Sequence, residues 1–423
     1  MKILILSSTD FRGGAARAAY RLHQGLLKTG INSQMLVQNK IGDDSTVIGP
    51  KSKIQRAIAA IRPALDQLPF SLHPNRDPTI NIYSSQWLPG KIIGKIKQIN
   101  PDIINLHWIC GGFVSIEALA ELDKPLVWTL HDMWAFTGGC HYSHECDSYI
   151  QSCGCCPQLG SDRQKDLSNW IWQRKAKAWK NLNLTIVTPS QWLARCAEAS
   201  SLFKCLPVKV IGNGIDIDTY KPHSPQLARE LLGLPLNKRI ILFGALDSTQ
   251  DKRKGFSLLL AALQALQQLQ TPDTIELVIF GASEPIQPLN FGFKTRYIGK
   301  LSDNISLSLL YAAADVFVAP SIQDNLPNTV LESLSCGTPC AAFNIGGMPD
   351  LIEHQQNGYL AAAFSALDLA EGISWILDNP VRYQQLATRS RQKVETEFNL
   401  DYQTKLYLQL FTNLCSKLPL SIS

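Results

Sequence analysis

Residues Pro320–Gly358 read PSIQDNLPNTVLESLSCGTPCAAFNIGGMPDLIEHQQNG, and they follow the short apolar run Val316–Ala319. The run predicts a buried strand, the turn-forming residues after it predict a loop, and Thr329–Ser335 predicts a helix that stops at a Gly-Thr-Pro sequence. The first N–H groups of a helix have no acceptor within it, so they attract anions. The order of strand, loop and helix therefore predicts an anion site at the backbone of Asn328–Val330.

Two carboxylates, Asp324 and Glu332, stand eight positions apart around this loop and helix start. We expect Glu332 one turn into the helix and Asp324 on the loop before it. One carboxylate suits vicinal hydroxyls, the N–H groups suit a phosphate, and the other carboxylate suits a second polyol. A nucleotide diphospho-sugar carries all three groups. The plainer alternative is that Asp324 only caps a loop and Glu332 is a solvated helix residue.

The same segment resembles the signature of the retaining GT-B glycosyltransferases of the family 4 type, in which seven residues separate two glutamates. Glu332 matches the second glutamate and Ser335–Pro339 matches the small-residue run after it. Asp324 stands where the family has its first glutamate, which keeps the charge but shortens the side chain. The resemblance implies that Glu332 binds the ribose hydroxyls of a donor and Asp324 its sugar hydroxyls. It also implies that the N–H groups of Asn328, Thr329 and Val330 bind the diphosphate.

The length and composition indicate a globular protein of more than one domain. The chain has 423 residues, 45% hydrophobic and 18% charged, and its net charge of +5 does not indicate nucleic-acid binding. No apolar run is long enough to span a bilayer. The first apolar run, Ile3–Leu6, is too short for a signal-peptide core, so we expect a cytoplasmic protein with reduced cysteines.

Short apolar runs alternate with helical patterns along the chain, which is typical of parallel α/β sheets. The expected strands of a first series are Lys2–Ser7, Gln34–Val37, Ile103–His107, Leu126–Leu130, Leu184–Thr188 and Val208–Ile211. Those of a second series are Arg239–Gly244, Glu276–Gly281, Thr295–Ile298, Val316–Ala319 and Pro339–Phe343. Two such series predict an α/β protein with two Rossmann-like domains.

The junction between the two series lies at Asn213–Asp216, which matches an Asn-Gly-Ile/Val-Asp element that opens the second domain in the resembled family. We therefore expect an acceptor-binding domain over residues 1–211 and a nucleotide-sugar-binding domain over residues 212–400. By the resemblance these two domains face each other. A C-terminal helix over residues 401–423, by the same resemblance, crosses back to pack on the first domain.

A basic turn, Asp251–Gly255, follows the first strand of the second series. The resembled family has Gly-Arg after this strand and Lys-Gly a short distance later, and both cations face the donor diphosphate. Lys254 matches the lysine, but Ala245 stands at the arginine position. Arg253 is the candidate to replace the missing charge. The alternative is a solvated basic turn.

The first strand leads into a glycine pair, Gly13 and Gly14, with Arg17 in the helix that follows. This is not the G-x-G-x-x-G pattern, so nicotinamide binding loses its main support. A glycine pair at a helix start allows close approach of a phosphate or an acceptor. The resembled family has a matching loop that faces the cleft, and the alternative is a plain tight turn.

Two histidines are expected at the carboxyl ends of strands, where open α/β sheets bind ligands. His131 follows Leu126–Leu130 and matches a histidine that in related transferases contacts the transferred sugar. His107 ends Ile103–His107 and matches less specifically. A histidine at a strand end is also often a structural residue.

A cysteine cluster follows His131, with Cys140, Cys146, Cys153 and Cys156 in a C-x5-C-x6-C-x2-C pattern. In a reducing compartment such a pattern favours a tetrahedral structural zinc over disulfides. Cys155 would be left free. The alternative is an inert, reduced loop.

The segment Lys51–Leu65 combines a helical apolar period with lysine and arginine on its other positions. A basic amphipathic helix of this kind can rest on anionic lipid at the inner face of a membrane. Amphipathic helices more commonly face a core, and that reading is the favoured one here.

Taken with the resemblance, the sequence predicts a hexosyltransferase that moves a sugar from a nucleotide diphospho-sugar to a sugar or lipid-linked acceptor hydroxyl. The resemblance implies retention of anomeric configuration, no catalytic cofactor or metal, and a setting in polysaccharide or glycolipid biosynthesis. Asp324, Lys254 and His131 would act at the reacting centre. The alternatives are a GT-B sugar-nucleotide epimerase and a degenerate, non-catalytic GT-B binding protein. Ala245 and Asp324 depart from the family pattern and support the second alternative.

Overall fold

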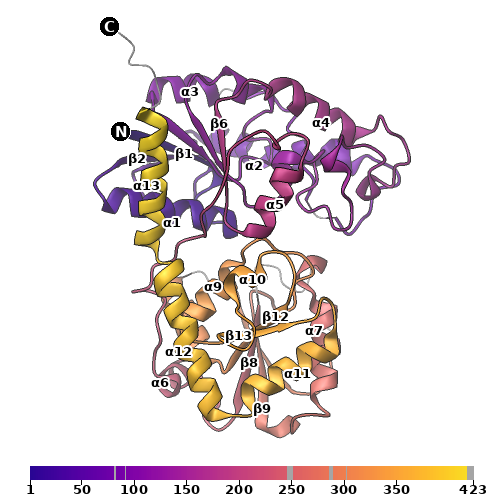
Figure 1. Ribbon diagram of the computed structural model, residues 1–423, viewed down its shortest axis with the longest axis vertical. Coiled ribbons are helices and arrows are strands. Elements are labelled where there is room, and N and C mark those ends of the chain that lie inside the picture. The colour runs from indigo at the N-terminus through magenta and orange to yellow at the C-terminus, as the bar shows by residue number, and fades with distance from the viewer. Residues whose placement is uncertain (81, 91, 245–250, 285–288, 302, 417–423) are drawn as a thin grey trace. The chain divides into compact units, whose positions relative to one another are not determined.

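The chain folds into two compact units in a computed structural model that describes residues 1–416 except 81, 91, 245–250, 285–288 and 302 (Figure 1). Unit 1 comprises Met1–Gly212 with Gln403–Ser423, and unit 2 comprises Asn213–Tyr402. In the described part of the chain, no helix combines the length and the apolar character needed to cross a bilayer.

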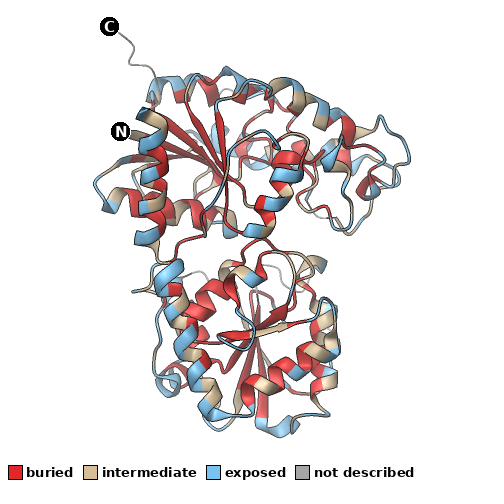
Figure 2. Cartoon of the chain, viewed as in Figure 1, coloured by how far each residue is buried: buried red, intermediate tan, exposed pale blue. Residues whose placement is uncertain are grey.

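Unit 1 is built on a parallel sheet with strand order β3-β2-β1-β4-β5-β6-β7 among its described residues. The strands are β1 Lys2–Thr9, β2 Asn32–Asn39, β3 Val47–Ile48, β4 Ile103–Leu106, β5 Leu126–Thr129, β6 Leu184–Thr188 and β7 Val208–Val210. Central strands such as β4 and β5 are buried at every residue, because both faces of the sheet are covered (Figure 2).

The helices of unit 1 cover these two faces. They are α1 Gly14–Lys28, α2 Lys53–Ser71, α3 Ile92–Ile99, α4 Leu167–Ala178, α5 Gln191–Ala199 and α13 Leu400–Ser416, most of which belongs to unit 1. Ile3 and Ile5 of β1 pack in one core with Tyr407 and Phe411 of α13. Leu4, between those isoleucines, packs in the core on the opposite face, because side chains alternate along a strand.

Unit 2 repeats the architecture with strand order β10-β9-β8-β11-β12-β13 in its described residues, again all parallel. Its strands are β8 Arg239–Gly244, β9 Ile275–Phe280, β10 Lys294–Gly299, β11 Val316–Ala319, β12 Cys340–Phe343 and β13 Gly358–Ala361. Its helices are α6 Pro225–Leu232, α7 Phe256–Leu266, α8 Asn304–Ala313, α9 Asn328–Ser335, α10 Met348–Leu351, α11 Ala366–Leu377 and α12 Pro380–Glu397.

The predicted fold class, α/β with two parallel sheets, is confirmed. Three predicted strands have the observed bounds, and the others differ by one or two residues at one or both ends. The prediction missed β3 and β13. Val47–Ile48 is only two residues long, and Gly358–Ala361 begins with a glycine after a turn, so neither gives a recognisable apolar run.

Candidate functional site

The polar residues predicted in unit 2 meet where its strand order reverses. β8 lies between β9 and β11, so the chain leaves β8 toward one side of the sheet and β11 begins the other side. Loops that follow the carboxyl ends of such neighbouring strands diverge and leave a crevice for a ligand. Lys254 follows β8 along the chain, and Asp324 follows β11.

Lys254 and Asp324 form a short ion pair at this edge. The Lys254 Nζ lies 2.7 Å from Asp324 Oδ2, and the Arg253 guanidinium lies 3.6 Å from the same oxygen. Burial alone would raise the pKa of the Asp324 carboxyl, but the two cations hold that pKa below its usual value. Arg253 is also bound to Asp251 at 3.0 Å and to the Gln323 carbonyl, so part of its charge is already compensated.

Glycines bring the two loops together. Gly255 has a φ of +71°, and a Cβ there would fall 1.7 Å from the carbonyl oxygen of Pro320. Gly346 has a φ of +53°, and its Cβ would fall 2.1 Å from the carbonyl oxygen of Asp324, which accepts the N–H of Gly347 at 3.1 Å. Backbone must approach backbone at both places, which is why only glycine fits after Lys254 and in the Gly-Gly pair.

Glu332 lies in α9, one turn from the helix start, and is buried. Its Oε2 accepts a hydrogen bond from Tyr311 Oη at 3.2 Å, which orients the carboxylate. At the helix start, the Val330 N–H donates to the Pro327 carbonyl at 3.2 Å, and Asn328 Oδ1 accepts from Asn213 Nδ2 at 3.3 Å. Of the three backbone N–H groups predicted to bind an anion, that of Val330 therefore already donates a hydrogen bond within the first helical turn.

A small, open hollow adjoins this cluster. Phe243 and Phe317 give it an apolar side, while Lys254 and Thr329 line it with a cation and a helix-start residue. Lys254 and the beginning of α9 therefore border the same space. Ala245, at the position of the family arginine, lies outside the described residues.

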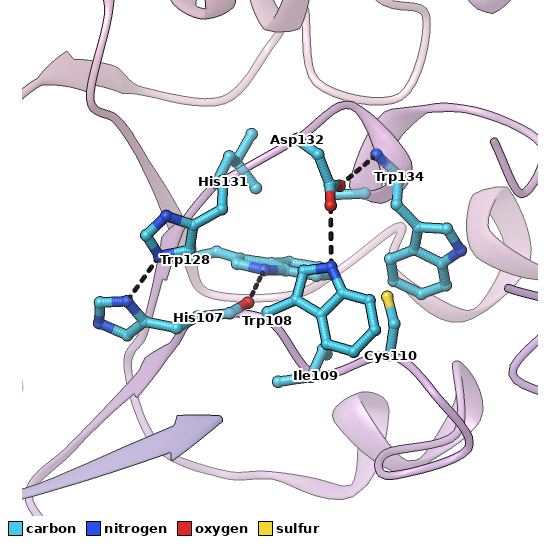
Figure 3. A pocket seen from close by; sticks show the side chains of 10 residues that line it. His107, Trp108, Ile109, Cys110, Trp128, His131, Asp132 and Trp134 are labelled. Atoms are coloured by element: carbon cyan, nitrogen blue, oxygen red, sulfur yellow. Dashed lines mark hydrogen bonds between the residues drawn. The ribbon is translucent and has the colours of Figure 1, made fainter. Parts of the chain in front are cut away.

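In unit 1 the two predicted histidines meet at the carboxyl edge of the sheet (Figure 3). His131 Nε2 lies 2.9 Å from His107 Nδ1, and His107 Nε2 lies 3.0 Å from Asn105 Oδ1. The Asn105 amide nitrogen donates to the Val127 carbonyl, so its oxygen faces His107 and can only accept. His107 must therefore donate from Nε2 and accept at Nδ1 from the Nε2–H of His131.

This chain of hydrogen bonds continues to the C-terminal helix. Asn105 Nδ2 also lies 3.1 Å from Thr129 Oγ1, which bonds Tyr407 Oη of α13 at 2.9 Å. Burial lowers the pKa of His131 to about 4 against the opposing influence of Asp132, and burial with the neighbouring His131 lowers the pKa of His107. Both imidazoles are uncharged at neutral pH, and the tautomer of His131 is fixed.

Asp132, next to His131, anchors the loop that follows β5. Its carboxylate accepts the Trp108 indole N–H at 2.8 Å and the Trp134 backbone N–H at 2.9 Å, and it lies 2.7 Å from His141 Nδ1. Burial would raise the pKa of Asp132, but His141 and these hydrogen bonds lower it. Trp108, Asp132 and Trp134 also line a small hollow in unit 1, together with His131.

The glycine pair begins α1 as predicted for a helix start. Gly13 is the N-cap with a φ of 92°, a conformation that favours glycine, and the Arg17 N–H donates to the Gly13 carbonyl at 3.1 Å. Gly14 is exposed and Arg17 is half-buried.

The four cysteines of the predicted zinc site share one neighbourhood. Burial raises the pKa of the Cys140 thiol, and Cys156, Cys153 and Cys146 raise it further; burial likewise raises the pKa of Cys153 to about 12. All four thiols are free of disulfides. Within the described residues, no group of three or more His, Cys, Asp or Glu side chains is arranged to hold a metal ion. Zinc binding by Cys140, Cys146, Cys153 and Cys156 stays a prediction.

Several residues that organise these sites were not predicted. Lys175 is buried with its Nζ 3.6 Å above the Trp134 ring, bonds the Trp134 and Thr137 carbonyls, and has its pKa lowered by burial to about 7. Tyr311 comes from α8, 21 residues before the Glu332 side chain that it holds. Asp132 and Asn105 had local signals, since Asp132 adjoins His131 and Asn105 lies two residues before His107.

Two family models match the chain. The model described as Glycosyltransferase Family 4 matches residues 12–219, and the model described as Glycosyl transferases group 1 matches residues 237–379. The first segment contains His131 and the cysteine cluster, and the second contains Lys254, Asp324 and Glu332.

Curated relatives match over different lengths. D-inositol 3-phosphate glycosyltransferase 2 of Catenulispora acidiphila is 27% identical over 187 residues, which is 41% of this chain and 43% of that protein. WcaC of Escherichia coli K12, named as a colanic acid biosynthesis glycosyl transferase, is 26% identical over 373 residues, 84% of this chain and 85% of WcaC. The chain thus spans less than half the length of the first relative and most of the second.

Two solved structures are similar throughout. Sucrose-phosphate synthase from Thermosynechococcus elongatus has a TM-score of 0.70 at 18% identity, covering 98% of this chain and 99% of that chain. HepE from Anabaena, in complex with UDP-glucose, has a TM-score of 0.65 at 17% identity, covering 98% and 100%. At these identities the likeness shows a shared fold.

Proposed function

Because this chain belongs to the glycosyltransferases of the family 4 type and has the GT-B fold, we propose that it moves a sugar from a nucleotide diphospho-sugar to an acceptor hydroxyl with retention of configuration. The observation that carries the proposal is the part-buried Lys254–Asp324 pair beside α9, at the strand-order reversal of unit 2. A cation, a carboxylate and helix N–H groups at one strand edge fit a charged donor with many hydroxyls.

The closeness of Lys254 and Asp324 fits the covalent structure of such a donor. The anomeric carbon of the sugar is bonded directly to an oxygen of the outer phosphate. A cation on that phosphate and a carboxylate on the sugar hydroxyls must therefore lie side by side, as Lys254 Nζ and Asp324 Oδ2 do at 2.7 Å. When the donor binds, its phosphate would contact Lys254 and its sugar hydroxyls would contact Asp324, which replaces part of the contact between these two side chains.

Glu332 is assigned to the ribose hydroxyls. Tyr311 holds one carboxylate oxygen at 3.2 Å, so the group has a fixed direction before the donor arrives. The N–H groups of Asn328 and Thr329 and the Lys254 ammonium would share the diphosphate. Arg253, bound to Asp251, would add a weaker share.

In the reaction, the bond between the anomeric carbon and the phosphate oxygen breaks, and its electron pair goes to that oxygen. The acceptor oxygen bonds the anomeric carbon on the same face and gives its proton to the leaving phosphate. Negative charge therefore grows on the diphosphate in the transition state, where the preorganised Lys254 lowers the barrier. A catalytic divalent metal is not required in this scheme, because Lys254 and helix N–H groups meet the charge.

His131 of unit 1 is the residue we assign to the transferred sugar. Its Nε2–H donates to His107 at 2.9 Å, which holds the imidazole in one orientation. The neutral state set by burial suits an acceptor of hydrogen bonds.

The setting we propose is polysaccharide or glycolipid assembly with a sugar or lipid-linked acceptor. Support comes from WcaC, which matches over most of its length and is named for colanic acid biosynthesis. HepE, which shares the fold, was solved with UDP-glucose, so a uridine diphospho-sugar is the first donor to test.

The test is a panel of nucleotide sugars in which hydrolysis, epimerisation and transfer are measured separately. We expect transfer to an acceptor, with slow hydrolysis without one. Release of an epimerised sugar without an acceptor would favour the epimerase, and binding without turnover of any donor would favour the degenerate protein.

The matched variants are Glu332→Gln and Glu371→Gln, the latter an exposed residue of α11. Hydrogen bonds to a charged group are worth about 1.5–3 kcal/mol each, so loss of the carboxylate charge should weaken donor binding about tenfold or more in calorimetry. Glu371→Gln should bind normally. Equal donor affinity in the two variants would remove Glu332 from the site.

A further inference from the structure

The helix α2 turns its apolar stripe away from its own domain. Six large apolar residues of this helix are exposed. They are spaced alternately four and three positions apart, which places them on one side of the helix. They are Ile54, Ile58, Ile61, Leu65, Leu68 and Leu72, the last of which is the C-cap. Ile54 is 73% exposed and Ile58 53%. The interpretation favoured from the sequence, that this stripe faces the core, is therefore wrong.

A different side of α2 holds the helix to unit 1. Ala59, Asp66 and Phe70 are the buried residues of the helix, and Gln38 Nε2 donates to the Ala59 carbonyl at 3.1 Å. Arg62 donates to the Gly112 carbonyl at 2.6 Å. These anchors fix which side of α2 faces solvent, so the exposed stripe is a stable property of the folded unit.

The residues around the stripe are cationic. Lys51, Lys53 and Arg56 are exposed at the start of α2, while the one acidic residue of the helix, Asp66, is buried on the anchoring side. Burial and the nearby Lys51 lower the pKa of Lys95 in α3, which places a further cation beside this end. Trp87 is 41% exposed and donates its indole N–H to the Leu65 carbonyl, so an interfacial aromatic borders the stripe.

We propose that α2 with Trp87 is the surface by which this protein binds an anionic lipid membrane. Aliphatic side chains in a row enter the acyl boundary, and the cations beside them contact lipid phosphates, which is the division of labour of an interfacial helix. A second copy of the chain is a poorer occupant. A two-fold interface would set this patch against itself and bring the same cations together.

The surface also bears on the acceptor. Binding through α2 would hold unit 1 at the bilayer, and if the function proposed above also holds, a lipid-linked acceptor is the class that unit 1 would meet there. Membrane binding itself is independent of that function, because it is measured without donor or acceptor.

The experiment is flotation of the full chain with vesicles of equal parts phosphatidylglycerol and phosphatidylcholine, and with vesicles of phosphatidylcholine alone. We expect binding to the first and little to the second, weakened by salt. Ile58→Glu with Leu65→Glu should lower the vesicle affinity by about tenfold or more. Replacing Lys51, Lys53 or Arg56 by Gln should lower it by about fivefold each.

The matched control is Leu227→Glu with Leu231→Glu on α6 of unit 2, where both leucines are exposed as well. It adds the same charges and should leave binding unchanged, and circular dichroism should show all variants folded. No binding to anionic vesicles, or equal loss in the control, would overturn the proposal. So would a dimer in solution that Ile58→Glu dissociates without any vesicle binding, since a second copy would then be the occupant.

Discussion

The two sheets end in polar sites of different construction. At the carboxyl edge of unit 2, charged side chains pair with each other: Lys254 bonds Asp324 at 2.7 Å, and Arg253 stands 3.6 Å from the same oxygen. At the corresponding edge of unit 1, uncharged imidazoles form a row from His131 through His107 to Asn105. One edge holds charges ready to meet a charged ligand, and the other holds neutral acceptors in a fixed tautomer. In a transferase the first suits a diphosphate and the second suits a hydroxyl.

The largest effect should come from the charged edge. Lys254→Ala should lower kcat by about 10²–10³, and donor affinity by less, because the charge that Lys254 meets grows in the transition state. Arg253→Ala should have a smaller effect, because Asp251 already compensates its guanidinium at 3.0 Å. Steady-state kinetics of both variants give the comparison. Equal losses would mean that the two cations share the role, and normal turnover of Lys254→Ala would place the diphosphate elsewhere.

Acidification should destabilise unit 1 more than unit 2. Burial lowers the pKa of His23 and of His131 to about 4, and of His107 in the same direction, and all three lie in unit 1. The unfolded chain then binds more protons than the folded one between pH 4 and 6.5, so stability falls as pH falls through this window. One histidine whose pKa is shifted in this way lowers the free energy of unfolding by about 2 kcal/mol at pH 5, relative to neutral pH. Asp66, whose pKa burial raises to about 6, opposes part of this loss.

We therefore expect hydrogen exchange in β4 and β5 to speed up between pH 7 and pH 5 more than exchange in β8 and β11, after correction for intrinsic rates. His131→Phe should flatten the pH dependence of unit 1, whereas His354→Phe at an exposed site of unit 2 should leave it unchanged. A pH dependence of equal slope in both units would contradict the comparison.

The smallest effect on turnover should come from the cysteines. If Cys140, Cys146, Cys153 and Cys156 take up zinc, the Cys140 and Cys153 thiols must lose protons that burial now retains. Elemental analysis of protein purified without chelator should then show about one zinc per chain. Chelation should lower the stability of this loop and affect activity only indirectly, through Asp132 and His131. Metal-free protein of full stability would refute the prediction.

The sequence predicted the edge of unit 2 better than the edge of unit 1, and the reason is physical. Asp324 and Glu332 lie within one strand-loop-helix unit, and local periodicity and turn residues suffice to place them. The row in unit 1 depends on contacts between side chains that the fold brings together, with Thr129 bonded to Tyr407 from the far end of the chain. Periodicity gives no signal for such pairs. It also gave the wrong orientation for α2, because an apolar period shows that a helix has an apolar side but does not show whether that side faces the core or solvent.

The row of hydrogen bonds behind His131 ends on α13, and this has a consequence for how the protein is made. His131, which follows β5, is translated before unit 2, whereas Tyr407 and Phe411 of α13 are translated after it. Until they arrive, Ile3 and Ile5 lack their apolar cover and Thr129 lacks its partner. Unit 1 therefore reaches its final form only after unit 2 has been translated, although most of unit 1 is translated first. A nascent chain carries an incomplete first unit through the whole synthesis of the second, and is open to chaperones and proteases for that time.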